Sequence, residues 1–430
     1  MRFKLLIVKY FLQLRLQRIL LQHSRKLPLW QGRKLLQHLE NVARRSPFYR
    51  EIQEKKEALP LMNKSSYMDA FDQINMAGIR KEEALRVAME AERSRDFSPT
   101  IGKITVGLSS GTSGNRGVFL VSEDERARWV GAMLDRVLGW SFRKRRLAFF
   151  LRANSNLYES GRSSLLEFGF FDLLLPIQVH IERLRSFQPH ILVAPASVLL
   201  KIAEACKAGS LSLDCHKIIS VAEVLEEADK AYMEAIWGQK IHQVYQCTEG
   251  FLGYTCAEGT LHLNEDMVIF EKKEIEGGRF HPVIYDFTRM TQPMLRYELN
   301  DLLHPRPDPC PCGSVFMAID RIEGRSDDCF LMDTAEGQRI TLFPDVLRHV
   351  VLGADSRFRS YLMEQTSASE IHLWIDVEAQ QFESSCEQLR RALDAFFQEQ
   401  HIREIRYTFT LGLPELKDQK LRRIKRSYHA

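Results

Sequence analysis

Strand-like and helical segments alternate through the middle of this chain, and this order constrains its fold more than any other feature. Residues 104–110 are strand-like, and a helical segment follows from about Ser122 to Leu138. Further short apolar segments, typical of buried strands, lie at residues 147–151, 191–194, 218–222 and 241–245, with a helical segment at 223–237. Strands that alternate with helices favour an α/β fold with a mostly parallel sheet and helices on both faces.

The pattern changes toward the end of the chain. Strand-like residues 283–287 and 294–299 precede a proline-rich stretch, and a new series of segments begins beyond Gly324. These segments, at residues 340–352, 371–377, 382–399 and 405–411, are typical of a small α+β domain. We therefore expect residues 1–100 to form an N-terminal helical segment of the large domain, residues 101–323 its α/β part, and residues 324–430 a mobile α+β domain. This agrees with the two or three units expected of 430 residues.

Charge is distributed unevenly along the chain. The formal net charge of +4 is small for 430 residues and does not indicate a nucleic-acid partner. However, no acidic residue precedes Glu40, whereas nine basic residues do. Lys9 and Arg15 interrupt the apolar residues there, so the segment lacks the about 20 apolar residues that span a bilayer, and it does not resemble a signal peptide.

Two interpretations of this basic segment remain open. The irregular periodicity favours a helix packed on the body of the protein itself. The alternative is an amphipathic helix that lies on an anionic membrane. We accordingly expect a cytoplasmic protein, with peripheral membrane contact as the alternative.

The strongest local signal is a loop rich in glycine and hydroxyl groups at residues 109–117. Its three glycines let the backbone approach a ligand closely, and its four hydroxyls and free N–H groups can surround phosphate oxygens. The loop follows a predicted strand and precedes a predicted helix, a position where such loops bind anions. It is neither a P-loop nor a GxGxxG fingerprint, and a flexible Gly/Ser turn is the alternative.

This loop resembles the phosphate-binding signature of the adenylate-forming, or AMP-binding, superfamily. Within it, the chain is most similar to the phenylacetate-CoA ligase group and to relatives of the synthetases that adenylylate a deazaflavin coenzyme. The resemblance extends over nearly the whole chain and includes residues 46–50, 59–64 and 149–155. It implies an acyl-CoA synthetase-like fold whose small domain is joined by a hinge. The residues that would hold the ATP phosphates are Ser109, Ser110, Gly111, Thr112, Ser113 and Gly114.

A second motif, Tyr245-Gln246-Cys247-Thr248-Glu249, follows the predicted strand at 241–245. The resemblance implies that Tyr245 packs on adenine, that Thr248 touches the α-phosphate and that Glu249 helps to hold Mg²⁺. A divalent cation is needed because triphosphate oxygens repel an incoming carboxylate. The alternative is an ordinary strand end with an exposed acid.

Two further segments are similar to family motifs around the nucleotide. Residues 296–302 keep the family's spacing between tyrosine and aspartate, which implies that Asp301 accepts hydrogen bonds from the ribose hydroxyls. Residues 321–328 resemble the family's interdomain hinge, which implies that Arg325 reaches the ribose and that Asp327 is the pivot.

The last basic segment, residues 417–426, resembles the family's Gly-Lys-x-x-Arg-like motif. By composition alone it could instead contact RNA or membrane. The resemblance implies that Lys420 bonds the α-phosphate and the acid during adenylation, with Lys417 as the second candidate. A cation there would stabilise the charge that develops on pentacoordinate phosphorus.

Four residues form a candidate metal site. Cys310 and Cys312 form a tight knuckle, and Cys256 and His262 lie upstream at a plausible ligand spacing. Three sulfurs and one imidazole make a closed tetrahedral set that suits structural Zn²⁺. Members of the phenylacetate-CoA ligase group have similar sets; the alternative is a group of unrelated thiols and a surface histidine.

Together these features predict a ligase that uses ATP and Mg²⁺ to convert a carboxylic acid, aryl or arylacetic, into an acyl-AMP with release of pyrophosphate. The acyl group would then pass to CoA or another thiol. Two alternatives remain: adenylyl transfer to a hydroxyl of a cofactor-like acceptor, and a non-catalytic membrane-associated scaffold. The predicted partners are small molecules, and both a monomer and a homodimer remain open.

Overall fold

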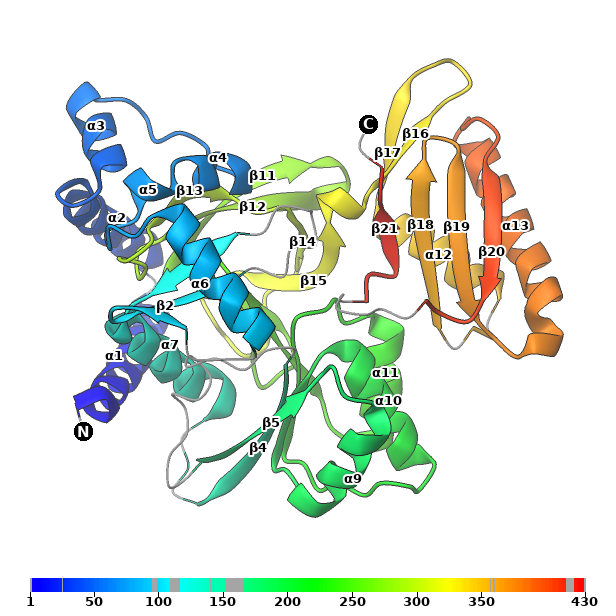
Figure 1. Cartoon of the computed structure of the whole chain (residues 1–430), viewed down its shortest axis with the longest axis horizontal. Helices are drawn as coiled ribbons and strands as arrows, with labels where there is room; N and C mark the ends of the chain where they lie inside the picture. The colour runs from blue at the N-terminus through cyan, green and yellow to red at the C-terminus, as the bar shows by residue number, and fades with distance from the viewer. Residues whose placement is uncertain are drawn as a thin grey trace. The chain divides into compact units, whose positions relative to one another are not determined.

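The computed structural model describes residues 2–24, 26–94, 99–108, 117–139, 141, 143–151, 166–355, 357–358, 360–414 and 421–428. They form two compact units (Figure 1). The large unit comprises Met1–Leu299 and Leu303–Ile322, and the small unit comprises Asn300–Leu302 and Glu323–Ala430. The last change from the large to the small unit lies within strand β15 (Ala318–Arg325).

Helices dominate the start of the large unit. They are α1 (Arg2–Ser24), α2 (Leu27–Ala43), α3 (Pro47–Lys55), α4 (Lys64–Asp69), α5 (Phe71–Ile74) and α6 (Lys81–Ser94). Helix α1 buries Ile7 and Tyr10 against Ala127 and Val130 of α7 (Glu123–Met133). The basic segment is thus a helix packed on the body of the protein, as the first interpretation predicted. Among the described helices, none is both long and apolar enough to cross a bilayer.

One half of the main sheet is parallel and follows the predicted alternation. Its spatial order is β5 (Leu166–Asp172), β4 (Arg145–Leu151), β6 (Ile191–Ala194), β7 (Lys217–Ser220) and β8 (Ile241–Cys247). The connecting helices are α9 (Ile177–Phe187), α10 (Ala196–Lys207) and α11 (Glu227–Trp237). Successive residues of β4 face opposite sides, because Ala148 and Phe150 pack with these helices whereas Leu147 packs in the other core cluster. Helices α1, α2 and α7 contribute to that second cluster, so helices cover both faces.

The other half of the sheet is antiparallel. Beyond β8 its order is β9 (Gly250–Thr255), β10 (Leu261–Leu263), β15, β14 (Asp301–Pro305), β12 (Arg279–Asp286) and β11 (Val268–Ile275), and β13 (Met294–Glu298) also pairs with β12. A short 3-10 turn at Glu276–Gly278 joins β11 to β12. The predicted α/β class is confirmed, but within this sheet the parallel strand pairs are confined to β4–β8, because later strands are joined by hairpins without crossover helices.

The environment of the glycine-rich loop differs from the prediction. Strands β1 (Thr100–Ile101), β2 (Ile104–Leu108) and β3 (Val118–Val121) form a separate antiparallel sheet. The loop therefore joins two paired strands rather than a strand and a helix, because Val118 and Leu120 are buried and pair with β2. Helix α7 begins after β3, where Ser122 and Glu125 form a capping box, and it continues as a π-helical turn at Leu134–Leu138.

The small unit is α+β. A hairpin of β16 (Phe330–Asp333) and β17 (Arg339–Leu342) accompanies a four-stranded sheet of β20 (Arg406–Leu411), β19 (Glu370–Asp376), β18 (Ser360–Ser367) and β21 (Ile424–Arg426). Its helices are α12 (Pro344–Ala354) and α13 (Phe382–Glu399), and short 3-10 turns lie at Ser326–Asp328 and Ala379–Gln381. Leu389, Leu393 and Phe397 of α13 pack on the sheet and make a core separate from that of the large unit.

Candidate active site and metal centre

A pocket in the large unit gathers residues from four parts of the chain. Together with adjoining solvent space, it spans about 280 Å³. The lining residues are Lys64, Tyr67 and Met68 of α4, Gly117 and Val118 at the start of β3, Thr248 and Glu249 between β8 and β9, and Gln292, Met294 and Tyr297 around β13. The predicted phosphate and Mg²⁺ residues Thr248 and Glu249 thus share a pocket with Gly117, the last residue of the predicted loop.

Thr248 and Glu249 occupy a two-residue turn between antiparallel strands β8 and β9. The turn packs closely on the strand behind it, because a Cβ atom at Gly250 would lie 3.0 Å from Oδ2 of Asp286. Glycine at this position therefore lets the turn approach β12 closely. This contact fixes Thr248 and Glu249 at the end of the β8–β9 hairpin.

Tyr297 orients the carboxylate of Glu249. Its hydroxyl donates a hydrogen bond to Glu249 Oε1 over 3.0 Å, and its ring lies edge-on to Tyr67 with centroids 5.4 Å apart. Burial, and then the negative charge of Glu249, raise the pKa of the Tyr297 phenol well above its usual value. The phenol therefore remains a proton donor to the carboxylate at every physiological pH.

A buried polar network lies directly behind the pocket. Arg289 Nη1 donates to the carbonyl oxygens of Thr248 and Glu249 over 3.2 and 3.3 Å. Gln292 accepts a hydrogen bond from Leu120 N–H at 2.8 Å and donates to the Val118 carbonyl at 3.1 Å. These two side chains fasten the Thr248–Glu249 turn and the start of β3 to the same short segment of chain.

Glu125 holds that segment in turn. Its carboxylate accepts hydrogen bonds from the backbone N–H groups of Met290 and Thr291, over 2.7 and 2.9 Å. Burial raises the pKa of Glu125, but the charge of Arg289 and hydrogen bonds from Thr291 and Ser122 outweigh it, so the pKa lies below its usual value. Glu125 therefore stays ionised, and its negative charge compensates the positive charge of Arg289.

Sequence reasoning did not find Arg289, Gln292 or the role of Tyr297. The only signal is the polar run 288–292 between two strand-like segments, which reads as an ordinary loop. Arg289, Thr291 and Gln292 are nevertheless buried, and burial is not visible in a single sequence.

Tyr245, the predicted adenine contact, lies in β8 with its side chain in the core of the large unit. It is not among the described residues that line the pocket. The side-chain oxygen of the next residue, Gln246, accepts a hydrogen bond from Trp129 of α7 at 3.1 Å.

The predicted ribose and hinge residues cluster in the small unit. Arg325 Nε lies 3.6 Å from Asp301 Oδ1, so the two residues predicted to bind ribose form an ion pair. Asp327 accepts a hydrogen bond from the Asn300 side chain at 2.7 Å. The structure therefore brings residues 300–301 and 325–327 together.

The loop residues Ser109, Ser110, Gly111, Thr112, Ser113 and Gly114 lie outside the described residues, as do Lys417 and Lys420. The segment that follows Lys420 is described. Arg422 forms an ion pair with Asp328, and β21 pairs in parallel with β18. This ion pair attaches the chain just after Lys420 to the predicted hinge segment within the small unit. Burial lowers the pKa of Arg422 to about 10.

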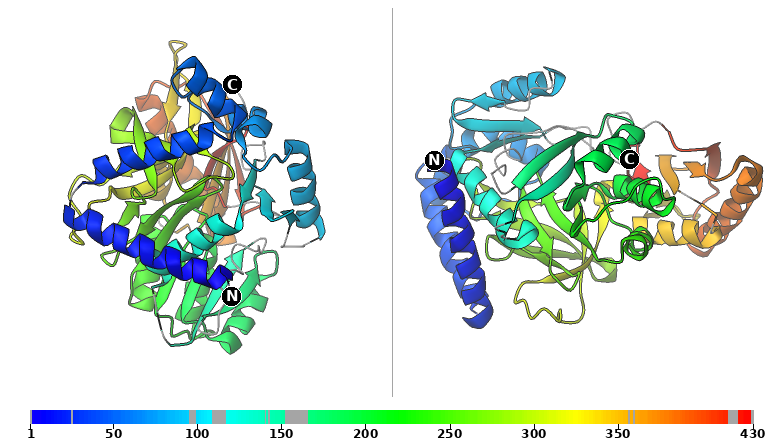
Figure 2. Two further views of the ribbon diagram at one scale, coloured as in Figure 1. Left: turned by 90° about the vertical axis from the view of Figure 1, so that its left-hand side faces the viewer. Right: turned by 90° about the horizontal axis from the view of Figure 1, so that it is seen from below.

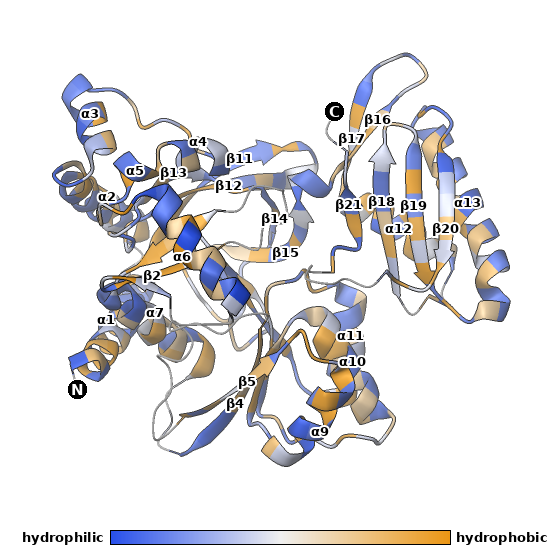
Figure 3. Cartoon of the chain, viewed as in Figure 1, coloured by the Kyte–Doolittle hydropathy of each residue, from blue (hydrophilic) through white to orange (hydrophobic). Residues whose placement is uncertain are grey.

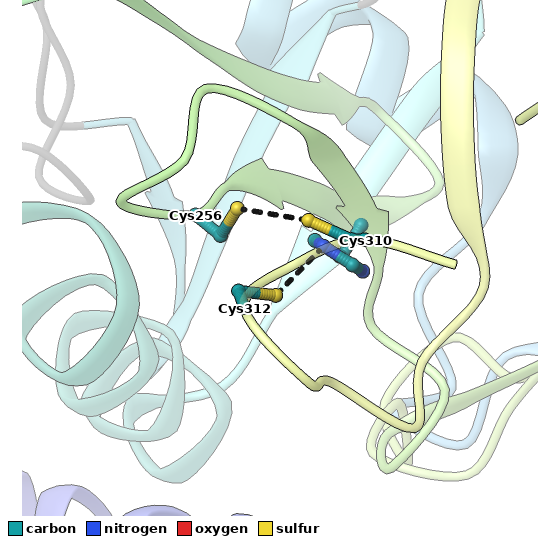
Figure 4. A group of neighbouring side chains, drawn as sticks. Cys256, Cys310 and Cys312 are labelled. Carbon is teal, nitrogen blue, oxygen red and sulfur yellow. Dashed lines mark hydrogen bonds between the residues drawn. The ribbon is translucent and has the colours of Figure 1, made fainter. Parts of the chain in front are cut away.

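The four predicted metal ligands come together in the large unit. Figure 4 shows the three cysteines Cys256, Cys310 and Cys312 side by side. Their ligand atoms all lie within 4.8 Å of one another. Cys256 follows β9, His262 lies in β10, and Cys310 and Cys312 lie in the connection from β14 to β15. The Nδ1 atom of His262 is 3.0 Å from the Phe316 carbonyl, an arrangement that directs Nε2 toward the sulfurs.

The thiols of this cluster interact strongly. Burial raises the pKa of Cys310, but hydrogen bonds from Thr260 and from the backbone of Cys312 lower it to about 6. Burial and the neighbouring sulfurs raise the pKa of Cys312 to about 12. The lowered pKa of Cys310 favours negative charge on this sulfur. Three sulfurs and one imidazole at these distances fit tetrahedral Zn²⁺, which would offset that charge.

Comparisons with known proteins agree on the fold. No family model matches this chain. Protein CapK of Staphylococcus aureus is 27% identical over 165 residues, which are 37% of this chain and 36% of CapK, so the match spans about a third of that relative. The structure of 2-hydroxyisobutyryl-CoA ligase, in the postadenylation state with R3-HIB-AMP, superimposes with a TM-score of 0.68 and 17% identity, covering 94% of this chain and 90% of the ligase.

Two other structures are also similar. The amide bond synthetase McbA from Marinactinospora thermotolerans has a TM-score of 0.52 and 13% identity, over 71% of this chain and 65% of McbA. The anthranilate-CoA ligase AuaEII, in complex with anthranoyl-AMP, has a TM-score of 0.52 and 14% identity, over 74% of this chain and 66% of AuaEII. The chain has the fold of adenylate-forming ligases.

Proposed function

We propose that this protein adenylates a carboxylic acid with ATP, releases pyrophosphate and transfers the acyl group to CoA or another thiol. One observation carries the proposal: in a chain with this fold, Thr248, Glu249 and Gly117 line a single pocket. The fold alone hosts several chemistries, so the convergence of these residues gives the argument its weight. We place the enzyme in the phenylacetate-CoA ligase group, with an aryl or arylacetic acid as substrate.

In the first step, a carboxylate oxygen attacks the α-phosphorus of ATP, and the bond from that phosphorus to the pyrophosphate oxygen breaks. Thr248 and the loop residues 109–114 would hold phosphate oxygens, and Lys420 would stabilise the charge on the pentacoordinate phosphorus. Glu249, oriented by Tyr297, would hold Mg²⁺, which offsets the negative charge of the triphosphate when bound.

The remaining predicted nucleotide contacts are Tyr245, Asp301 and Arg325. We assign adenine to Tyr245 and the ribose hydroxyls to Asp301 and Arg325. The ion pair between Asp301 and Arg325 supports the ribose assignment, because a carboxylate and a guanidinium at one place can accept from and donate to the same diol. Asp327 would be the pivot about which the small unit moves between the adenylation and thiol-transfer steps.

The Cys/His cluster would hold a structural Zn²⁺. Cys256, His262, Cys310 and Cys312 would supply all four ligands of a tetrahedral site, so no position would remain open for a substrate. The ion would fasten the hairpin of β9 and β10 to the connection between β14 and β15.

A screen of ATP–pyrophosphate exchange against a library of carboxylic acids tests the proposal. Exchange that requires an added acid supports it, and we expect Lys420→Ala to slow exchange by orders of magnitude without affecting folding, whereas the exposed Lys55→Ala should leave the rate unchanged. A stable AMP ester in place of a thioester would indicate a hydroxyl acceptor. If the purified protein does not bind Mg-ATP, the enzyme assignment is wrong and the scaffold alternative gains support.

A further inference from the structure

Helix α1 has two apolar faces. One face packs on the large unit through buried Ile7, Tyr10, Phe11, Leu14 and Leu21. The other carries large apolar side chains that remain exposed: Leu5, Val8, Leu12, Leu16, Ile19 and Leu20. Helices α1 and α2 lie along the near side of the large unit in the left view of Figure 2, and orange residues occur among blue ones along α1 in Figure 3.

The exposed side chains form a continuous stripe. At about 100° per residue, all six fall within an arc of about 120°, on the side of the helix opposite the buried residues. Leu12, Leu16 and Leu20 are each 58% exposed, and Leu5 is 63% exposed. An exposed apolar stripe of this kind lowers the solubility of a protein, and it is typical of a surface that has a binding partner.

The charges around this stripe indicate which partner fits. Arg2, Lys4, Lys9 and Arg15 are all exposed on α1, and no acidic residue occurs before Glu40. Lys9 lies within the arc of the stripe, and Arg15 lies beside it. Long basic side chains can extend their charged ends to lipid phosphates while their methylene stems stay with the acyl chains.

We infer that the exposed face of α1 binds the surface of an anionic lipid bilayer, with the stripe in the boundary between headgroups and acyl chains and the basic residues on anionic headgroups. A helix with leucines on one face and a basic flank suits this position. A second copy of the chain fits less well, because two such stripes in contact would bring basic flanks together without acidic partners on α1. The inference does not depend on the proposed enzymatic activity.

Flotation of the full chain with lipid vesicles tests this inference. We expect binding to vesicles that contain phosphatidylglycerol, weaker binding as salt is raised, and little binding to pure phosphatidylcholine. The triple variant Leu5→Ser/Leu12→Ser/Leu16→Ser should lower the bound fraction at least about tenfold. The double variant Lys9→Glu/Arg15→Glu should do the same through charge alone.

The matched control is Leu174→Ser/Leu175→Ser, which removes two similarly exposed leucines from the loop after β5. It should bind vesicles as the wild type does, and all variants should unfold at the same temperature, because the replaced side chains are exposed. Wild-type protein that binds no vesicles, or a triple variant that binds undiminished, overturns the inference. So does light scattering that finds a dimer which the triple variant dissociates, because the stripe then belongs to a second copy.

Discussion

Gln292 offers a sensitive test of the network behind the pocket. Its side chain is 1% exposed and forms hydrogen bonds with the Leu120 N–H group and the Val118 carbonyl, both in β3. The substitution Gln292→Leu keeps a side chain of similar volume but removes both polar atoms. Two backbone groups beside the pocket then lose their partners while they remain buried.

The expected cost follows from those two groups. A buried backbone donor or acceptor left without a hydrogen bond costs about 1–3 kcal/mol, so the loss of two partners should lower the unfolding free energy of the large unit by roughly 2–6 kcal/mol. That loss is a large fraction of the total stability of a typical domain, about 5–15 kcal/mol. Since β3 begins at the pocket, the KM for ATP in pyrophosphate exchange should also rise.

Urea denaturation of the full chain measures the stability, with a fluorescence probe in the large unit because the two units can unfold separately. Gln292→Glu is the intermediate variant: it retains an acceptor for Leu120 N–H but cannot donate to Val118, so about half of the loss is expected. Gln53→Leu, on an exposed position of α3, is the matched control. If Gln292→Leu unfolds within about 0.5 kcal/mol of the wild type, the network does not hold β3 as described.

Three further predictions concern other parts of the chain. Tyr297→Phe, which removes the hydrogen bond to Glu249, should slow pyrophosphate exchange about tenfold, whereas Tyr285→Phe, which removes an exposed bond to Glu271 and an interaction with Arg296, should not. Cys310→Ser should abolish stoichiometric zinc in elemental analysis and lower the unfolding midpoint, and Cys386→Ser in the small unit should retain both. Burial lowers the pKa of His38 to about 4, so the unfolded chain takes up a proton on this residue near pH 6.5 and the folded chain only near pH 4. Stability should therefore fall as the pH drops through that window, by up to roughly 3 kcal/mol, and His38→Asn should flatten the profile in denaturation at pH 7 and pH 4.5.

Local patterns predicted several elements well. Helix α13 has the predicted bounds Phe382–Glu399, and strand β6 has the predicted bounds Ile191–Ala194. The apolar residues of α13 recur with the period of a helix, and those of β6 form a short continuous run, so each pattern is complete within the segment. The sequence analysis missed strand β18 (Ser360–Ser367), because its polar residues interrupt the apolar pattern of a strand. It is a strand because it pairs with β19 and β21.

The same contrast applies to the pocket. Thr248 and Glu249 could be predicted because they form part of a short contiguous motif at the end of an apolar strand. Arg289 and Gln292 could not, since they reach Glu249 and β3 from 40 and more residues away in the chain. No local pattern records which distant segments a sheet will bring together.

The periodicities, the polar motifs and the four metal-ligand residues can thus be recognised in the sequence alone, because each pattern lies within short segments of the chain. Folding added the antiparallel pairing around the glycine-rich loop, the buried partners of Glu249, and the opposite faces of α1. Those features arise from contacts between segments far apart in the chain, where burial and pairing give a residue its role.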